Sequence, residues 1–248
     1  MDLARQRKSP NEFSELIMYH DPRSPVSEAF RTLRTNLDFM SPGAPLKSIL
    51  VSSPGPGEGK SSIAANLAIA MAHANKRVIL VDADLRKPTQ HKLFSLPNRV
   101  GLTSLLVKNA NQDIQQEVAV PGLSVITSGP IPPNPSELLA SDVMDAVKHS
   151  LASKADIVIY DAPPIAVVTD AIILGSKLDG TLMVVRLGVT SREATKKAKE
   201  LLKTSRSRVL GIVVNDVPNR TGYGNYHYYE YYYSEHDIDT DSDSEGIR

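Results

Sequence analysis

The chain has 248 residues, of which 41% are hydrophobic and 23% charged, a composition typical of a globular protein with one or two domains. Its 28 Lys and Arg residues balance its 28 Asp and Glu residues, so an overall basic field for nucleic acid is absent. The lack of cysteine excludes disulfides, thiolate metal sites and a cysteine nucleophile. No apolar run approaches the roughly 20 residues of a membrane span, and the charged N-terminal residues predict no signal peptide.

The first 25 residues carry mixed charge and several prolines, and we interpret residues 1–25 as an N-terminal arm. From residue 26 to residue 216 the pattern predicts one folded domain. The domain begins with apolar residues at helical spacing, and predicted strands and helices alternate after this first helix. The predicted helices cover residues 26–40, 61–75, 134–152, 170–178 and 191–205, with Ser136 as a possible cap of the third. The predicted strands cover residues 48–52, 78–81, 123–126, 157–160, 181–186 and 209–214.

The predicted strands are continuously apolar rather than alternating. This pattern is typical of a mostly parallel sheet that helices cover on both faces. The sequence therefore predicts an α/β fold with a central parallel sheet, followed by a tail.

Acidic and aromatic residues are concentrated in that tail. Residues 216–248 contain eight acidic residues and two basic ones, so this segment has a net charge of −6 and the preceding residues have +6. Seven of the nine tyrosines lie between Tyr223 and Tyr233. Because no regular apolar pattern is visible, we predict a flexible tyrosine-rich and acidic segment over residues 217–248.

A glycine-rich turn joins the first predicted strand to the helix at residues 61–75. A strand, a turn ending in Gly-Lys-Ser and a helix are the components of a P-loop, which indicates a P-loop NTPase. In such a loop the glycines turn backbone N–H groups toward phosphate, Lys60 reaches the β- and γ-phosphates, and the Ser61 hydroxyl binds Mg²⁺. Pro54 occupies the position of the first glycine of the strict pattern. We predict bound ATP and Mg²⁺, with nucleotide contacts from Gly57, Glu58, Gly59, Lys60, Ser61 and Ser62.

Acidic residues follow two other predicted strands. Asp82 and Asp84 end one strand, and Asp161 ends another. Because ligands of open parallel sheets lie beyond the carboxyl ends of the strands, these carboxylates should converge on the phosphate region. Any one of them alone would most often be a turn or cap residue. Together they predict a metal site formed by Ser61, Asp82, Asp84 and Asp161, with Lys60, Asp82 and Asp84 as catalytic residues.

Asn215 ends the last predicted strand, on the same edge of the sheet as the P-loop. Its side chain has two interpretations of equal weight, a hydrogen bond to the adenine edge of the nucleotide or an Asx-turn.

With these motifs in chain order, the sequence resembles the bacterial tyrosine kinases, or BY-kinases, of capsule and exopolysaccharide synthesis. Residues 56–61 resemble the family's modified Walker A motif, residues 79–86 its Walker A′ motif with Asp82, Asp84 and Arg86, and residues 158–164 its Walker B motif. Glu28, Arg31 and Arg34 match its Glu-x₂-Arg-x₂-Arg assembly motif. The C-terminal tyrosine cluster matches Tyr223, Tyr226, Tyr228, Tyr229, Tyr231, Tyr232 and Tyr233.

The resemblance implies a protein-tyrosine kinase that transfers the ATP γ-phosphate to tyrosines of its own tail and of other proteins. It implies that Asp82 helps to deprotonate the tyrosine and that Glu28, Arg31 and Arg34 join subunits into a ring. It also implies a cytoplasmic chain that a separate membrane modulator activates and recruits to the inner face of the membrane, with a cognate tyrosine phosphatase as a further partner. No nucleic-acid partner is expected.

Several alternatives are open on the sequence alone. A partitioning or positioning ATPase of the same fold is the main one, although such proteins usually carry an early P-loop lysine that is missing here. A catalytically idle export subunit is another, against which the intact Lys60 and the three aspartates argue. Glu28 and Arg31 are also compatible with an ordinary exposed ion pair on one helix. The tyrosine-rich segment has less favoured interpretations as a core strand or a nucleic-acid stacking surface, and the acidic residues 237–245 have one as a calcium loop.

Overall fold

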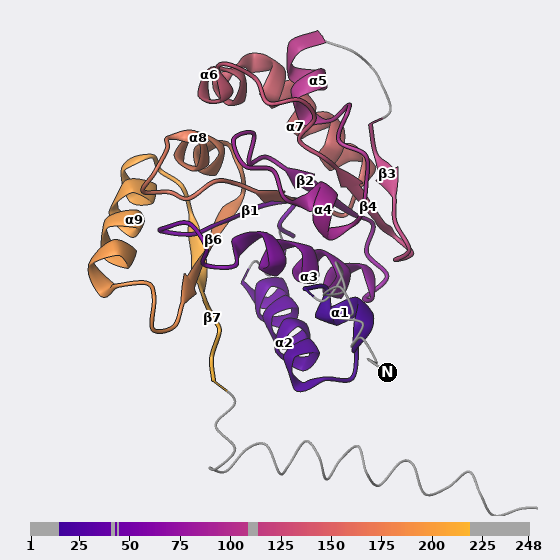
Figure 1. Ribbon diagram of the computed structural model, residues 1–248, viewed down its shortest axis with the longest axis vertical. Coiled ribbons are helices and arrows are strands. Elements are labelled where there is room, and N and C mark those ends of the chain that lie inside the picture. Colours follow the sequence, from indigo (N-terminus) through magenta and orange to yellow (C-terminus); the bar gives the residue numbers. More distant parts are fainter. Residues whose placement is uncertain (1–14, 41–42, 44, 109–113, 219–248) are drawn as a thin grey trace, which may run out of the picture. The chain divides into compact units, whose positions relative to one another are not determined.

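A computed structural model describes residues 15–40, 43, 45–108 and 114–218, and the fold over these residues is a layered α/β domain (Figure 1). Its centre is a seven-stranded sheet with the order β3-β4-β2-β5-β1-β6-β7. Each neighbouring pair is parallel except β3 and β4, which are antiparallel. The strands are β1 (Ser48–Ser52), β2 (Val78–Asp82), β3 (Gln116–Glu117), β4 (Leu123–Ile126), β5 (Ile157–Asp161), β6 (Gly180–Arg186) and β7 (Val209–Asn215). The α/β P-loop architecture with a mostly parallel sheet is therefore confirmed.

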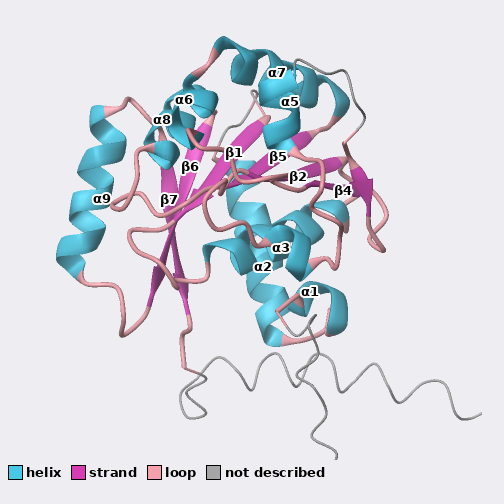
Figure 2. Cartoon of the chain, turned by 45° about the horizontal axis from the view of Figure 1, so that its top comes forward, coloured by secondary structure: helices cyan, strands magenta, loops and turns pink. Residues whose placement is uncertain are grey.

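Helices cover both faces of this sheet, as Figures 1 and 2 show. On one face lie α1 (Ile17–His20), α2 (Pro25–Phe39) and α3 (Lys60–Ala72), with α4 (Gln90–Leu93) beside α3. The other face is covered by α5 (Leu102–Lys108), α6 (Pro135–Ala140), α7 (Asp142–Lys154), α8 (Asp170–Lys177) and α9 (Arg192–Thr204). No helix in these described ranges is long and apolar enough to cross a membrane.

The side chains of each strand point alternately to the two faces of the sheet, which explains why the strands are apolar throughout. In β1, Ile49 and Val51 pack into the core beneath α2 and α3, whereas Leu50 packs into the core on the opposite face. Successive side chains of a strand point to opposite faces, so a sheet buried on both sides needs an apolar residue at nearly every position. Every residue of β1, β2 and β5 is buried accordingly.

The predicted helix over residues 134–152 is wrong in one respect, because the structure has two helices there, α6 and α7. Ser141 separates them in an extended conformation, and its hydroxyl accepts a hydrogen bond from the N–H of Met144 as the N-cap of α7. Ser136 is not a cap. Its hydroxyl donates to a carboxylate oxygen of Asp170 at 2.6 Å instead.

The last part of the predicted N-terminal arm, from residue 15 on, contacts the domain in the structure. Leu16 and Met18 are almost completely buried in the core next to α3. The N–H of Met18 donates to the side chain of Asn66 on α3 at 3.0 Å, which fixes α1 to the domain. The short elements α1, α4, α5 and β3 were not predicted, since each offers too few residues for a periodic pattern. The domain limits at residues 26, 216 and 217 stay predictions.

Candidate active site

The P-loop follows β1 and leads into α3, as the sequence predicts. Gly57 and Gly59 have φ of +73° and +88°, in the left-handed region that favours glycine. At Gly59 a Cβ atom would also lie 2.1 Å from the side-chain nitrogen of Asn215, so any other residue would clash there. Asn215 donates to the carbonyl oxygen of Glu58 at 3.0 Å. The last strand thus supports the loop through Asn215, and its contact with adenine stays a prediction.

Two predicted nucleotide-binding side chains have partners inside the protein. The Glu58 carboxylate is buried, accepts the N–H of Gly55 at 3.1 Å and accepts the hydroxyl of Thr190 at 2.7 Å. The hydroxyl of Ser62 donates to the carboxylate of Glu15. The Glu58 side chain therefore shapes the loop, and any contact that it makes with phosphate involves its backbone.

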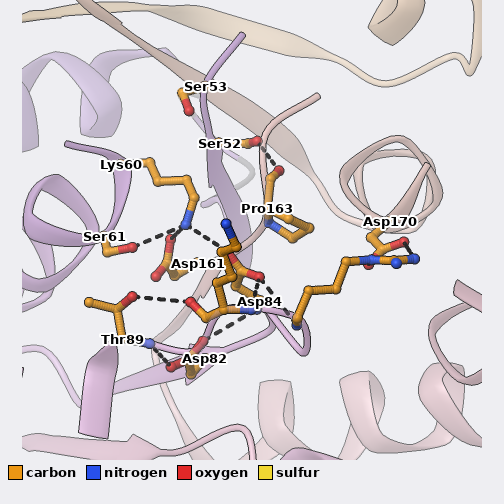
Figure 3. A network of polar contacts seen from close by, with 12 residues as sticks. Ser52, Ser53, Lys60, Ser61, Asp82, Asp84, Thr89, Asp161, Pro163 and Asp170 are labelled. Atoms are coloured by element: carbon orange, nitrogen blue, oxygen red, sulfur yellow. Dashed lines mark hydrogen bonds and ion pairs between the residues drawn. The ribbon is translucent and has the colours of Figure 1, made fainter. Parts of the chain in front are cut away.

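Lys60 lies at the centre of the predicted carboxylates (Figure 3). Its ammonium nitrogen is 3.0 Å from Asp84 and 3.4 Å from Asp161, and 3.1 Å from the Ser61 hydroxyl oxygen. Burial alone would lower the pKa of Lys60, but the carboxylates of Asp161 and Asp84 outweigh it and raise that pKa. The lysine is therefore a charged and firmly held group.

Asp82 lies directly beside Asp161, because the two residues are register partners on the adjacent strands β2 and β5. Both are completely buried. The carboxylate of Asp82 accepts the N–H groups of Thr89 and Gln90 at 2.9 Å each and that of Asp84 at 3.3 Å. Burial, followed by the charge of Asp161, raises the pKa of Asp82 to about 8, against the opposing effect of the Gln90 and Thr89 hydrogen bonds. Asp82 is thus held in place as a carboxyl group with a high proton affinity.

Sequence reasoning missed two residues that hold this cluster together. Gln90 is completely buried, and its side-chain nitrogen donates to Asp161 at 2.8 Å and to the carbonyl oxygen of Ser61 at 3.1 Å. Asp170, at the start of α8, forms two hydrogen bonds with the guanidinium of Arg86, at 2.9 and 3.1 Å. The arginine of the Walker A′ motif is therefore neutralised by an aspartate 84 residues away.

The oxygen groups around Lys60 are of the type that binds Mg²⁺. No group of three or more Asp, Glu, His or Cys side chains in the described part of the chain is arranged to hold a metal ion by itself. Mg²⁺ usually binds one or two carboxylates together with substrate phosphates and water. The Ser61 hydroxyl and the Asp84 and Asp161 carboxylates already surround one cation, the Lys60 ammonium, so they fit a magnesium ion that arrives with a nucleotide.

The predicted assembly motif lies on α2. Glu28 and Arg31 form an ion pair at 2.7 Å, and both side chains are about one-third exposed. Arg34 donates to the carbonyl oxygen of Ala70 on α3 at 2.9 Å. Arg34 therefore fastens α2 to α3, in addition to any contact with another subunit. The seven predicted phosphorylation sites, Tyr223 to Tyr233, lie outside the described residues.

This fold and this P-loop geometry define the chain as a P-loop NTPase. A model of the ParA family, described as NUBPL iron-transfer P-loop NTPase, matches residues 46–221. Tyrosine-protein kinase YwqD of Bacillus subtilis is 44% identical over 227 residues, which are 90% of this chain and 95% of that protein. The crystal structure of the chimerical protein CapA2B2 is 43% identical with a TM-score of 0.80, and the match covers 84% of this chain and 92% of that one. The chain therefore belongs to the bacterial tyrosine kinases within the ParA-type P-loop NTPases.

The alternative of a positioning ATPase is weaker. The septum site-determining protein MinD from Pyrococcus horikoshii is 20% identical with a TM-score of 0.58, and the match covers 68% of this chain and 69% of that one. This likeness shows a shared fold alone.

Proposed function

We propose that this chain is an ATP-dependent protein-tyrosine kinase whose acceptors include the tyrosine cluster of another copy of the chain. One observation carries the proposal. The Lys60 ammonium nitrogen lies 3.0 Å from the Asp84 carboxylate and 3.4 Å from that of Asp161, and Asp82 is the register partner of Asp161 on the adjacent strand. A P-loop lysine and several buried carboxylates at one edge are what phosphoryl transfer requires, because that reaction depends on positioning and on charge stabilisation.

In the proposed reaction the acceptor tyrosine oxygen forms a bond to the γ-phosphorus. The bond from that phosphorus to the β–γ bridging oxygen breaks, and ADP leaves. The proton of the tyrosine hydroxyl moves to the carboxylate of Asp82, which the N–H groups of Thr89 and Gln90 hold in place. Lys60 exchanges its contacts with Asp84 and Asp161 for the β- and γ-phosphates as the nucleotide binds. The Ser61 hydroxyl and the neighbouring carboxylates would hold Mg²⁺, which would supply positive charge to the phosphates.

We further propose the cellular setting that the family resemblance implies. The kinase regulates capsular or exopolysaccharide synthesis and export, acts in the cytoplasm, and is recruited to the inner face of the membrane by a membrane-embedded modulator. It assembles into a homo-oligomeric ring through Glu28, Arg31 and Arg34. A cognate tyrosine phosphatase reverses the modification of its tyrosine substrates.

The test is incubation of the purified full chain with γ-labelled ATP and Mg²⁺, followed by phosphoamino-acid analysis. Phosphotyrosine in the chain is the expected result. ATP hydrolysis without phosphotyrosine, in the presence and in the absence of the modulator, would instead identify a nucleotide-switched ATPase.

A further inference from the structure

A groove of about 620 Å³ lies against the candidate active site, between the loop that follows β2 and the loop that follows β4. The first loop and α4 form its basic wall, and the second loop supplies an apolar wall with Pro130 and the exposed Ile131. The basic wall contains Arg86, Lys87, His91 and Lys92. None of the described residues that line this groove is acidic.

The loop that follows β2 both lines the groove and donates hydrogen bonds to the two proposed catalytic carboxylates, Asp82 and Asp84. Thr89 lines the groove, and its N–H donates to Asp82 at 2.9 Å. Lys87 also lines it, and its N–H donates to Asp84 at 2.9 Å. Two residues that line the groove therefore also contact, through their backbone, the carboxylates that we propose to act on the acceptor tyrosine.

The positive charge of the groove comes from two lysines. Asp170 neutralises Arg86 through the paired hydrogen bonds described above. Lys87 and Lys92 are exposed, and neither forms an ion pair with another described residue. Two unpaired ammonium groups beside an apolar wall favour a ligand that combines carboxylates with apolar or aromatic side chains.

We propose that this groove binds the acidic residues next to the acceptor tyrosine, and that its occupant is the C-terminal segment of a second copy of the chain. The inference rests on the proposed kinase function and names the feature of the acceptor that the kinase recognises. The C-terminal segment has the required chemistry, because Glu230 lies between Tyr229 and Tyr231 and a run of acids follows Tyr233. In this arrangement Lys87 and Lys92 bind the carboxylates while Ile131 contacts a neighbouring tyrosine ring.

The experiment compares the transfer of phosphate between two engineered full-length chains. The enzyme has its seven tail tyrosines changed to Phe, so that it cannot label itself, and carries either wild-type lysines or Lys87→Gln with Lys92→Gln. A matched control carries Lys197→Gln with Lys199→Gln, which removes the same charge from exposed positions of α9 near the β7 edge of the sheet (Figure 1). The acceptor is the inactive Lys60→Met chain with its natural tail.

We expect the groove variant to raise the KM for the acceptor about 3- to 10-fold, since two partly exposed ionic contacts are lost. The kcat at saturating acceptor and the KM for ATP should stay close to those of the control variant. A second acceptor has Glu230 and the acids after Tyr233 changed to Gln or Asn. For this acceptor the wild-type and groove-variant enzymes should have the same KM, because the pairs being tested are already absent.

An unchanged KM for the natural acceptor would overturn the inference while leaving the kinase function intact. A KM increase that persists with the neutralised acceptor would also overturn it. A third outcome would also overturn the inference: the groove variant no longer binds vesicles of anionic lipid, while its KM for the acceptor is unchanged. That result would assign the groove to a membrane surface. No phosphotyrosine in either acceptor with the wild-type-lysine enzyme would instead reject the proposed function, and the inference with it.

Discussion

At the scale of single residues, Lys60 has a structural role besides its proposed catalytic one. It is the cation between Asp84 and Asp161, whose side chains are 5% and 0% exposed. Removing one partner of a buried ion pair leaves the other charge without compensation. In the nucleotide-free chain Lys60 therefore stabilises the fold by compensating the charge of these two carboxylates.

Lys60→Met should have two measurable effects. It should lower autophosphorylation at least about 100-fold, because a preorganised positive charge at the transferring phosphoryl group is lost. It should also lower the free energy of unfolding of the nucleotide-free protein by about 3 kcal/mol. Denaturant unfolding measures the second effect, with Lys60→Arg as the control that keeps the charge. Near-normal labelling of the tail in Lys60→Met would contradict the assignment of the site.

Asp82→Asn should reduce phosphotransfer more than it reduces ATP binding, because the change removes the proton acceptor and keeps the shape of the side chain. Measuring both on one preparation separates the two effects. A variant that simply fails to bind ATP would make Asp82 a nucleotide-binding residue.

The pH dependence of stability gives a second test of Asp82. Its folded-state pKa of about 8 lies above its ordinary value of 3.8, so the folded state binds the proton more tightly than the unfolded state does. The contribution of Asp82 to stability is therefore complete at low pH and is lost as the pH rises toward 8. The Tm of the nucleotide-free wild type should fall between about pH 4 and pH 8, and that of Asp82→Asn should fall less. Identical pH profiles would place the titration elsewhere.

At the scale of elements, α2 combines an internal contact with a proposed external one. Glu28 and Arg31 are partly exposed, whereas Arg34 binds a carbonyl oxygen of α3. An exposed ion pair contributes about 0–1 kcal/mol to stability, so its loss alone should hardly affect the fold.

Glu28→Ala with Arg31→Ala should therefore convert the proposed ring into folded monomers with little change in Tm. Arg34→Ala added to these should also lower the Tm, because it removes the contact with Ala70. Light scattering measures the size and calorimetry the Tm. If the double variant keeps the size of the wild type, Glu28 and Arg31 form an ordinary intrachain ion pair.

The elements also show how far a sequence pattern can predict a structure. Continuous apolar runs identified the six long strands, and the Gly-Lys-Ser junction located the site, since both signals are local. The break at Ser141 was missed because a serine N-cap within an apolar periodicity resembles an ordinary helical position. Gln90 and Asp170 were missed because their partners are 71 and 84 residues away, and no local spacing indicates such contacts.

At the scale of the whole molecule, charge is divided between the two parts of the sequence. Residues 216–248 carry −6, and the residues before them carry +6. Opposite charges on an enzyme and its acceptor favour their encounter, and salt weakens this attraction. The division fits a chain that serves both as kinase and as substrate for another copy.

A mixing experiment tests whether phosphate is transferred from one copy of the chain to another. Lys60→Met chains that keep the tail are incubated with labelled ATP, Mg²⁺ and active chains that lack residues 223–248. We expect phosphotyrosine on the Lys60→Met chain, which can acquire label only from its partner. An unlabelled Lys60→Met chain, under conditions in which the intact wild type labels itself, would contradict transfer between copies.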